Sequence, residues 1–178
     1  YGYVPEPKTI FRRAFKLSPA HSLKLQTGQN IPRVRCYWDV LFAPLGSISM
    51  QEAQEELIAR LRESVKIHLM TEVPLGAFLS GGVDSSAVVA MMASLMDKPV
   101  NTCSISFGDP AFNESQYAQA VANRYHTRHN VNQVDADDFD LIDKLSTLYD
   151  EPFADSSAMP TYRVCQLARR RVTVALSG

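Results

Sequence analysis

The residues best suited to chemistry lie in the run 79–86, Leu-Ser-Gly-Gly-Val-Asp-Ser-Ser, which we call the glycine loop. Two adjacent glycines, Gly81 and Gly82, can take backbone angles that other residues avoid, so an anion can approach the main chain closely. An uncharged strand pattern precedes the loop, and an apolar helix pattern follows it. A helix that begins near Asp84 would point its free N–H groups and its positive dipole end at a bound phosphate. The run therefore predicts a phosphate-binding turn between a strand and a helix.

Short polar side chains complete the glycine loop: Ser80, Asp84, Ser85 and Ser86. Two better-known phosphate loops do not fit. The Walker pattern requires a lysine that this loop lacks, and the dinucleotide fingerprint requires a third glycine where a serine stands. Ser-Gly-Gly-x-Asp-Ser-Ser resembles instead the PP-loop of the ATP pyrophosphatases, enzymes that cleave ATP between its α and β phosphates. The alternative is an ordinary strand-to-helix turn whose serines only cap the helix.

A loop without lysine cannot neutralise a triphosphate by itself, so we expect Mg²⁺ to supply positive charge. Hard cations prefer carboxylate oxygens, and Asp84 is the obvious ligand, directly or through water. Asp84 could also act as a helix N-cap, and the two roles are compatible. A second acidic group, Asp150, Glu151 and Asp155, could bind substrate or another magnesium ion, although acidic residues are common in solvated loops.

Ligands of open parallel sheets bind beyond the carboxyl ends of the strands. Three predicted strand ends turn outward through small residues, at 79–82, 107–108 and 176–178. The first would hold the phosphates, and the other two could hold adenine and ribose. Phe107 could equally be a core aromatic side chain that closes its strand.

The segments around the glycine loop alternate between strand and helix patterns. Ser49 and Glu52 have the spacing of a capping box at the start of a helix. The predicted helices are 49–70, 84–96, 113–124, 137–149 and 160–170, and the predicted strands are 74–79, 100–107, 127–134 and 172–176. This alternation predicts an α/β fold of Rossmann-like type, a mainly parallel sheet with helices on both faces.

Residues 1–45 differ in composition from the rest of the chain, since five prolines interrupt them and leave room only for short strands. Two alternating segments, 22–26 and 33–38, are separated by turn residues and predict a β-hairpin. Trp38 is expected to be a packing anchor. We therefore divide the chain into residues 1–45 and residues 46–178.

Composition excludes several function classes. The 178 residues carry 18 basic and 19 acidic side chains, a formal net charge of −1, so overall charge predicts no nucleic-acid partner. Apolar runs are too short to predict a membrane span. Three widely spaced cysteines predict reduced thiols, a cytoplasmic location and small core side chains. Both ends have the character of interrupted elements, so we expect an internal piece of a longer protein.

Over nearly its whole length the chain resembles the glutamine-hydrolysing asparagine synthetases of bacterial B type. The resemblance includes the loop and its preceding strand, 73–86, and the Cys-Ser-Ile-Ser-Phe-Gly strand, 103–108. It continues through Asn-Glu-Ser at 113–115, Asp-Glu-Pro-Phe-Ala-Asp at 150–155, and Leu-Ser-Gly at 176–178. Residues 1–40 look like the tail of that family's amidotransferase domain, which is of the Ntn-hydrolase type.

The resemblance implies a set of ATP-binding residues: Phe78, Leu79, Ser80, Gly81, Gly82, Asp84, Ser85, Ser86, Phe107, Ser177 and Gly178. Phosphate and magnesium would lie at the glycine loop, with catalytic roles for Asp84 and Ser80, and adenosine beside the aromatic residues and the Ser-Gly end. In this family, aspartate is adenylated at its β-carboxylate, pyrophosphate leaves, and ammonia from glutamine displaces AMP.

The implied partners are the small-molecule substrates and an amidotransferase domain in the same full-length chain, and a homodimer is compatible with the family. The glutaminase nucleophile and an acidic residue that follows the Ser-Gly end in this family lie outside the 178 residues. We therefore expect this piece alone to have no synthetase activity.

Other readings fit the same residues. A β-lactam-synthetase-like or peptide-cyclising enzyme would also adenylate a carboxylate but would use another acceptor. A non-catalytic module would bind adenine nucleotide without turnover. A reductase acting on adenylylated sulfate would need a reactive cysteine, and Cys103 and Cys165 lie in segments predicted to be buried.

Overall fold

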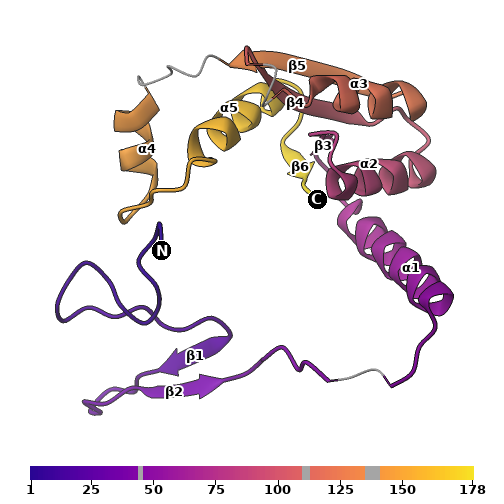
Figure 1. Cartoon of the computed structure of the whole chain (residues 1–178). Coiled ribbons are helices and arrows are strands. Elements are labelled where there is room, and N and C mark those ends of the chain that lie inside the picture. The colour runs from indigo at the N-terminus through magenta and orange to yellow at the C-terminus, as the bar shows by residue number, and fades with distance from the viewer. Residues whose placement is uncertain (44–45, 110–112, 135–140) are drawn as a thin grey trace. The chain divides into compact units, whose positions relative to one another are not determined.

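The computed structural model describes residues 1–43, 46–109, 113–134 and 141–178. The chain forms two compact units (Figure 1). Unit 1 comprises Tyr1–Ser47 and Ile142–Asp155, and unit 2 comprises Ile48–Leu141 and Ser156–Gly178. The sequence did not predict the second stretch of unit 1, which is inserted into the sequence of unit 2. The assignment of residues 1–45 to another domain stays a prediction.

Unit 2 is built on a four-stranded parallel sheet with the strand order β5-β4-β3-β6. The strands are β3 (Leu75–Phe78), β4 (Asn101–Phe107), β5 (Arg128–Val134) and β6 (Val174–Leu176). The chain moves outward from β3 to β5 and then returns to the other side of β3. This confirms the predicted α/β class with its parallel sheet, and each predicted strand is present within two residues of its expected limits.

Helices cover both faces of this sheet. The helices of unit 2 are α1 (Met50–His68), α2 (Val83–Leu95), α3 (Ser115–Arg124) and α5 (Ala158–Ala168). Side chains of α1, α2 and α3 share one core cluster with Leu75, Ala77 and Leu79 of the β3 region. On the other face, α5 packs with Phe78 and Cys103. Because alternate residues of a strand point to opposite faces, β3 contributes to both cores.

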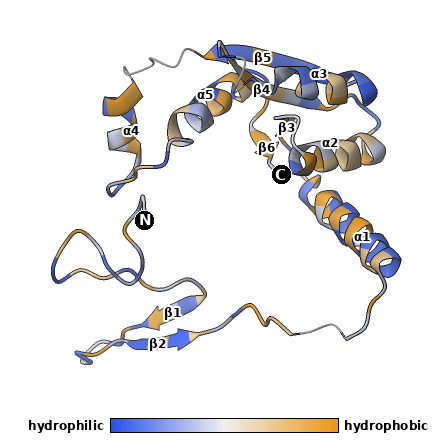
Figure 2. Cartoon of the chain, viewed as in Figure 1, coloured by the Kyte–Doolittle hydropathy of each residue, from blue (hydrophilic) through white to orange (hydrophobic). Residues whose placement is uncertain are grey.

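Local sequence explains where α1 begins and how much of each helix is buried. The predicted capping box is present: the Glu52 N–H donates to Ser49 Oγ at 3.2 Å, and the Ser49 N–H donates to the Glu52 carboxylate at 2.9 Å. The helix α1 carries both hydrophobic and hydrophilic side chains (Figure 2), as expected for a helix with one solvated face. By contrast, α2 is largely apolar beyond its first turn, and it buries Val89 and Met92 completely.

Unit 1 contains a two-stranded antiparallel sheet formed by β1 (His21–Lys24) and β2 (Arg33–Cys36). This confirms the predicted hairpin. The helix α4 (Ile142–Leu148) lies within the range predicted as 137–149, of which residues 137–140 are outside the described residues. None of the described helices is long and apolar enough to cross a membrane.

Several sequence expectations are corrected. The helix predicted from Asn113 begins at Ser115, because Asn113 Oδ1 accepts the Ser115 N–H at 3.0 Å in a turn that precedes the helix. Only Cys103 is a buried cysteine, and Cys36 and Cys165 are exposed. Trp38 is 61% exposed, so it is not a packing anchor within the described residues.

Candidate functional site

The glycine loop connects β3 to α2, as predicted. The Leu79 N–H still pairs with the Cys103 carbonyl of β4 at 2.9 Å, and the chain leaves the sheet at Ser80. Gly82 is the N-cap of α2 and Val83 is its first residue. The loop therefore begins at the carboxyl end of a parallel strand and ends at the positive end of a helix dipole.

The side chains of two serines form hydrogen bonds within the glycine loop. Ser85 Oγ accepts the Ser80 N–H at 3.3 Å and lies 3.0 Å from Ser80 Oγ. Ser80 Oγ in turn accepts the Gly82 N–H at 3.2 Å. The sequence predicted these hydroxyls as ligand donors, and the structure shows that they also fix the shape of the loop.

The twin glycines have different roles. Gly81 has a φ of +90°, and a Cβ there would lie 2.6 Å from both the Ala118 nitrogen and the Tyr117 Cβ of α3. Gly82 has a φ of −66°, which any residue can adopt. The need for glycine is therefore strongest at Gly81, where the loop packs directly on the start of α3.

The chain that follows β6 also lies beside the glycine loop. A Cβ on Gly178 would lie 2.5 Å from the Asp84 carbonyl carbon and the Ser85 nitrogen. The chain after β6 thus packs on the first turn of α2, which brings Ser177 and Gly178 to the glycine loop. This proximity agrees with the principle that neighbouring parallel strands place their carboxyl ends at one edge.

Donors for an anion are present at this edge. The first N–H groups of α2, including those of Asp84 and Ser85, have no acceptor within the helix. Ser86 Oγ is buried and has no hydrogen-bond partner among the described residues. Buried hydroxyls without a partner are rare. The Asp84 side chain lies at an exposed position, where its carboxylate is available to a cation.

A cavity of about 250 Å³ adjoins the loop. Four predicted site residues line it: Phe78, Leu79, Ser80 and Phe107. The opposite wall comes from α5, through Pro160, Thr161 and Val164, and Glu114 also contributes. Sequence reasoning missed these wall residues, although α5 begins only three residues after the Asp-Glu-Pro-Phe-Ala-Asp motif at 150–155.

Asp84, Ser177 and Gly178 line a second cavity of about 470 Å³. Its other lining residues come largely from α1 and the first turns of α2. The eleven predicted residues therefore gather around one loop, but Ser177 and Gly178 lie beside Asp84 rather than in the cavity of Phe78 and Phe107. The adenosine-binding role of each stays a prediction.

Two titratable groups near the sheet are shifted by burial. Burial raises the pKa of the Cys103 thiol, the positive charge of Arg171 acts in the opposite direction, and burial prevails, so this thiol is poorly nucleophilic. Burial lowers the pKa of His129, whose ring nitrogens lie 2.9 Å from Thr102 Oγ1 and 3.3 Å from Ser104 Oγ. Neither group supplies a reactive base or nucleophile to the glycine loop.

The acidic group predicted at 150–155 belongs to unit 1. Glu151 forms an ion pair with Lys16. Within the described ranges, no three His, Cys, Asp or Glu side chains are grouped as metal ligands. Asp84 alone could contribute to an ion that takes its remaining ligands from phosphate oxygens and water, as Mg²⁺ commonly does in nucleotide sites.

The family model and the two relatives described below all point to the same protein family. The model of the family described as asparagine synthase matches residues 56–178. A protein of Methanocaldococcus jannaschii named as a glutamine-hydrolyzing asparagine synthetase is 38% identical over 180 residues, which cover 99% of this chain and 34% of that protein. Glutamine-hydrolyzing asparagine synthetase 1 of Bacillus subtilis is 30% identical over 183 residues, covering 100% of this chain and 28% of that protein.

The chain thus spans about a third or less of the length of these relatives. Among solved structures, NMN synthetase from Francisella tularensis matches with a TM-score of 0.44 and 12% identity, over 72% of this chain and 54% of that one.

Proposed function

Because the chain belongs to the asparagine synthase family, we propose that it forms the ATP-binding part of an enzyme that makes asparagine from aspartate. The reaction class is ATP-dependent amide formation by a ligase. The observation that carries this proposal is the glycine loop, whose closed serine network and free helix N–H groups lie at the edge where β3 and β6 end.

In the proposed reaction, a β-carboxylate oxygen of aspartate attacks the α-phosphorus of ATP. A new P–O bond forms, the bond from the α-phosphorus to the bridging oxygen breaks, and pyrophosphate leaves. Ammonia then attacks the acyl carbon of the aspartyl adenylate, AMP leaves with the electron pair of the broken C–O bond, and the nitrogen loses a proton. The nitrogen would come from glutamine in an amidotransferase domain of the full-length protein.

The residues of the glycine loop are suited to hold the leaving group. The N–H groups at the start of α2 would donate to the β and γ phosphates, and the Ser86 hydroxyl would gain the acceptor it lacks. Developing negative charge on pyrophosphate would be stabilised by these preorganised donors. Asp84 would hold Mg²⁺ at the phosphates, where the ion supplies the positive charge that a loop without lysine cannot.

Adenine and ribose would occupy the cavity between Phe78, Phe107 and α5. We assign the whole protein small-molecule substrates and a cytoplasmic location. The domain assignment, 1–45 from the amidotransferase part and 46–178 from the synthetase part, is part of the same proposal.

The test is pyrophosphate exchange into ATP by the complete protein that carries this sequence. We expect exchange that depends on aspartate and Mg²⁺, and we expect Asp84→Asn to lower it at least about a hundredfold with the fold intact. The matched control is Asp97→Asn, an exposed carboxylate just beyond the other end of α2, which should leave exchange unchanged.

Three other results would count against the proposal. Exchange with another acid but not with aspartate would favour a β-lactam-synthetase-like or peptide-cyclising enzyme. Nucleotide binding without exchange for any acid would indicate a non-catalytic module. Full exchange in the Asp84→Asn variant would remove that carboxylate from the mechanism.

A further inference from the structure

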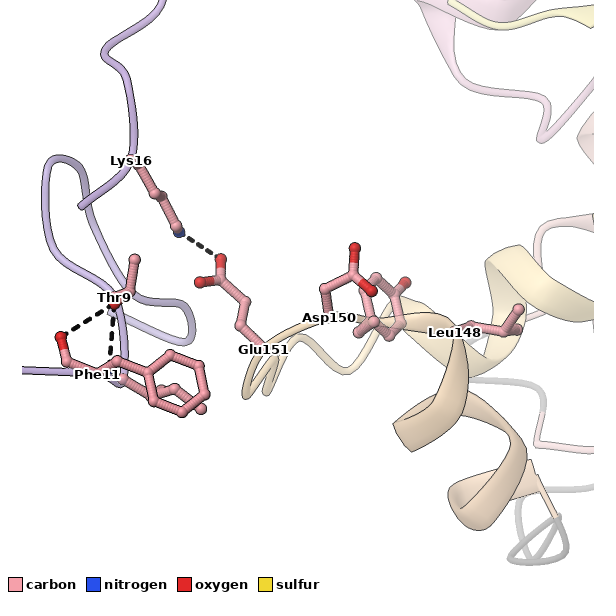
Figure 3. Close-up of a pocket in the computed structure, with 8 residues that line it drawn as sticks. Thr9, Phe11, Lys16, Leu148, Asp150 and Glu151 are labelled. Atoms are coloured by element: carbon pink, nitrogen blue, oxygen red, sulfur yellow. Dashed lines mark hydrogen bonds and ion pairs between the residues drawn. The ribbon is translucent and has the colours of Figure 1, made fainter. Parts of the chain in front are cut away.

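A carboxylate without a partner lies at the cavity of about 250 Å³ beside the glycine loop. It belongs to Glu114, the only charged residue among the described residues that line this cavity. The Glu114 side chain forms no hydrogen bond or ion pair with any described residue. The pocket of unit 1 differs in this respect, because Figure 3 shows its Glu151 side chain pointing toward Lys16, with which it forms an ion pair. Of these two glutamates, only Glu114 is left free for a ligand.

The position of Glu114 at the start of a helix is also unusual. It is the N-cap of α3, and its carbonyl accepts the N–H groups of Tyr117 and Ala118 at 3.0 and 3.2 Å. The preferred N-cap residues are Ser, Thr, Asp and Asn, whose side chains accept an N–H group of the first turn. The Glu114 side chain accepts none. Helix capping therefore does not explain a glutamate here, and positions that depart from local sequence rules are often functional sites.

The cavity is lined by buried apolar side chains inside and by exposed polar ones at its mouth. Phe78 and Val164 are half-buried and Cys103 is fully buried, whereas Glu114 and Thr161 are exposed. Ligand sites commonly combine an apolar lining with a few polar groups that fix the orientation of the ligand. A flat purine base suits the apolar interior, and a polar sugar suits the mouth.

The mouth of this cavity borders the glycine loop. Ser80 lines the cavity and is also the residue at which the chain leaves the sheet to form the loop. Gly81 packs on Tyr117 and Ala118, the two residues whose N–H groups pair with the Glu114 carbonyl. In ATP the ribose joins the base to the phosphates. With the base in the cavity and the phosphates at the loop, the ribose therefore lies between them, beside Glu114.

We propose that the Glu114 carboxylate binds the two ribose hydroxyls of ATP and thereby selects ribonucleotides. An ionised carboxylate only accepts hydrogen bonds, and the hydrogen-bond donors of ATP at neutral pH are its two ribose hydroxyls and its adenine amine. The two carboxylate oxygens suffice for both hydroxyls, and hydrogen bonds to an ionised acceptor are stronger than neutral ones. The inference rests on the proposed function, since it requires ATP in this cavity.

The experiment measures the binding of ATP and of dideoxy-ATP, which lacks both ribose hydroxyls, to the complete protein by isothermal titration calorimetry. Mg²⁺ is present and aspartate is absent, so that no adenylation occurs. The unaltered protein should bind ATP about tenfold more tightly than dideoxy-ATP, as expected for hydrogen bonds to a charged group. Glu114→Ala should weaken ATP binding about tenfold and leave dideoxy-ATP binding unchanged, because only ATP loses these bonds.

Two further variants separate this role from a structural one. Glu114→Gln keeps an acceptor oxygen without the charge, so it should retain part of the preference for ATP over dideoxy-ATP. Glu63→Gln is the matched control, since Glu63 is an exposed carboxylate of α1 that lines neither cavity near the glycine loop. Thermal unfolding of Glu114→Ala should be little changed, because the Glu114 side chain caps no N–H group of α3.

A second nucleotide tests which part of ATP meets Glu114. Purine riboside triphosphate lacks the adenine amine, and Glu114→Ala should weaken its binding by the same factor as that of ATP. If its binding is unchanged in that variant, the carboxylate binds the amine and the ribose assignment is wrong. An absent preference for ATP over dideoxy-ATP, or one that Glu114→Ala does not alter, also overturns the inference.

The failure of this inference is distinguishable from the failure of the proposed function. ATP binding that does not depend on Glu114, or that tightens in Glu114→Ala because a negative charge has been removed, overturns the role of Glu114 and leaves the proposed function standing. If the unaltered protein binds no ATP, both are wrong.

Discussion

At Gly81 the backbone combines a φ of +90° with a close approach to α3, where a Cβ would lie 2.6 Å from the Ala118 nitrogen. Its neighbour Gly82 has neither constraint on φ nor so close a contact, since the nearest atom to its Cβ would be Ser80 Oγ at 3.3 Å. The two glycines look equivalent in the sequence, and only the packing of the loop on α3 separates them. The predictions for single residues follow from the surroundings of each residue in the folded structure.

Gly81→Ala should lower the free energy of unfolding by at least about 2 kcal/mol, because left-handed strain adds to a clash with main-chain atoms. Urea denaturation followed by circular dichroism measures the change. Gly28→Ala is the control for strain alone, since Gly28 has a φ of +86° with nothing within 4 Å of the added Cβ. Equal losses in the two variants would show that the contact with α3 is unimportant.

His129 should make the fold sensitive to acid. Its pKa is lowered by burial from 6.5, so the unfolded chain binds a proton more readily than the folded one. Stability from this group is therefore complete above pH 6.5 and is lost as the pH falls below that value, by at most about 1.4 kcal/mol per pH unit. Hydroxyls of Thr102 and Ser104 face the ring, and within the described ranges no carboxylate is among its hydrogen-bond partners.

The urea midpoint at pH 7.5 and pH 5.5 tests this expectation. His129→Gln should reduce the difference between the two midpoints, whereas His68→Gln, at an exposed position of α1, should preserve it. An unchanged difference in the His129 variant would assign the acid sensitivity to other groups.

At the scale of elements, strong local signals were sufficient for much of the fold. The capping box at Ser49 and Glu52 gives the start of α1 to the residue, and the uncharged runs 74–79 and 100–107 give the two central strands. The cap of α3 was placed one residue early, at Asn113 instead of Glu114, because Asn113 is a good cap residue in sequence but serves a turn in the structure. Capping and turn chemistry use the same side-chain acceptor, so sequence alone does not separate them.

The candidate site also contains residues that the sequence could predict and residues that it could not. Residues adjacent to one another, 78–86, could be assigned from a motif, and strand ends identified Phe107, Ser177 and Gly178. The division into two cavities and the contribution of α5 could not be predicted, since they depend on which face of the sheet each helix covers. Buried and exposed cysteines were not distinguished for the same reason: Cys165 lies on the outer side of α5, and no local pattern marks that side.

Ser49→Ala should destabilise the start of α1 by about 1 kcal/mol, because the Glu52 N–H loses its acceptor. Chemical denaturation of unit 2 provides the measurement. Ser47→Ala, two residues earlier and also exposed, is the control and should change stability little. If both substitutions have the same effect, the capping box does not contribute.

For the molecule as a whole, the second stretch of unit 1 is the feature that sequence reasoning did not anticipate. The textural change near residue 45 was visible, but the stretch Ile142–Asp155 lies in the middle of an apparently regular α/β sequence. Its contacts with the N-terminal segment are long-range and polar, and neither periodicity nor composition reveals such contacts.

We expect this chain alone to bind ATP but to form no asparagine from ATP, aspartate and ammonia. The reason is coverage, since the chain spans only 28–34% of the length of the two relatives compared above. Mass spectrometry of the products, with the complete protein as the positive control, measures the outcome. Asparagine from the isolated chain would show that these residues contain everything the chemistry needs.

The close packing of Gly178 on the first turn of α2 has a consequence for the synthesis of this protein on the ribosome. Residues of the glycine loop leave the ribosome long before residue 178 does, yet the backbone at 178 fits against Asp84 and Ser85 too closely for any other amino acid. Because domains form from the N-terminus as synthesis proceeds, the edge at which β3 and β6 both end is complete only after residue 178 has been made. During that interval the growing polypeptide should have little affinity for nucleotide, so translation itself would delay the onset of binding.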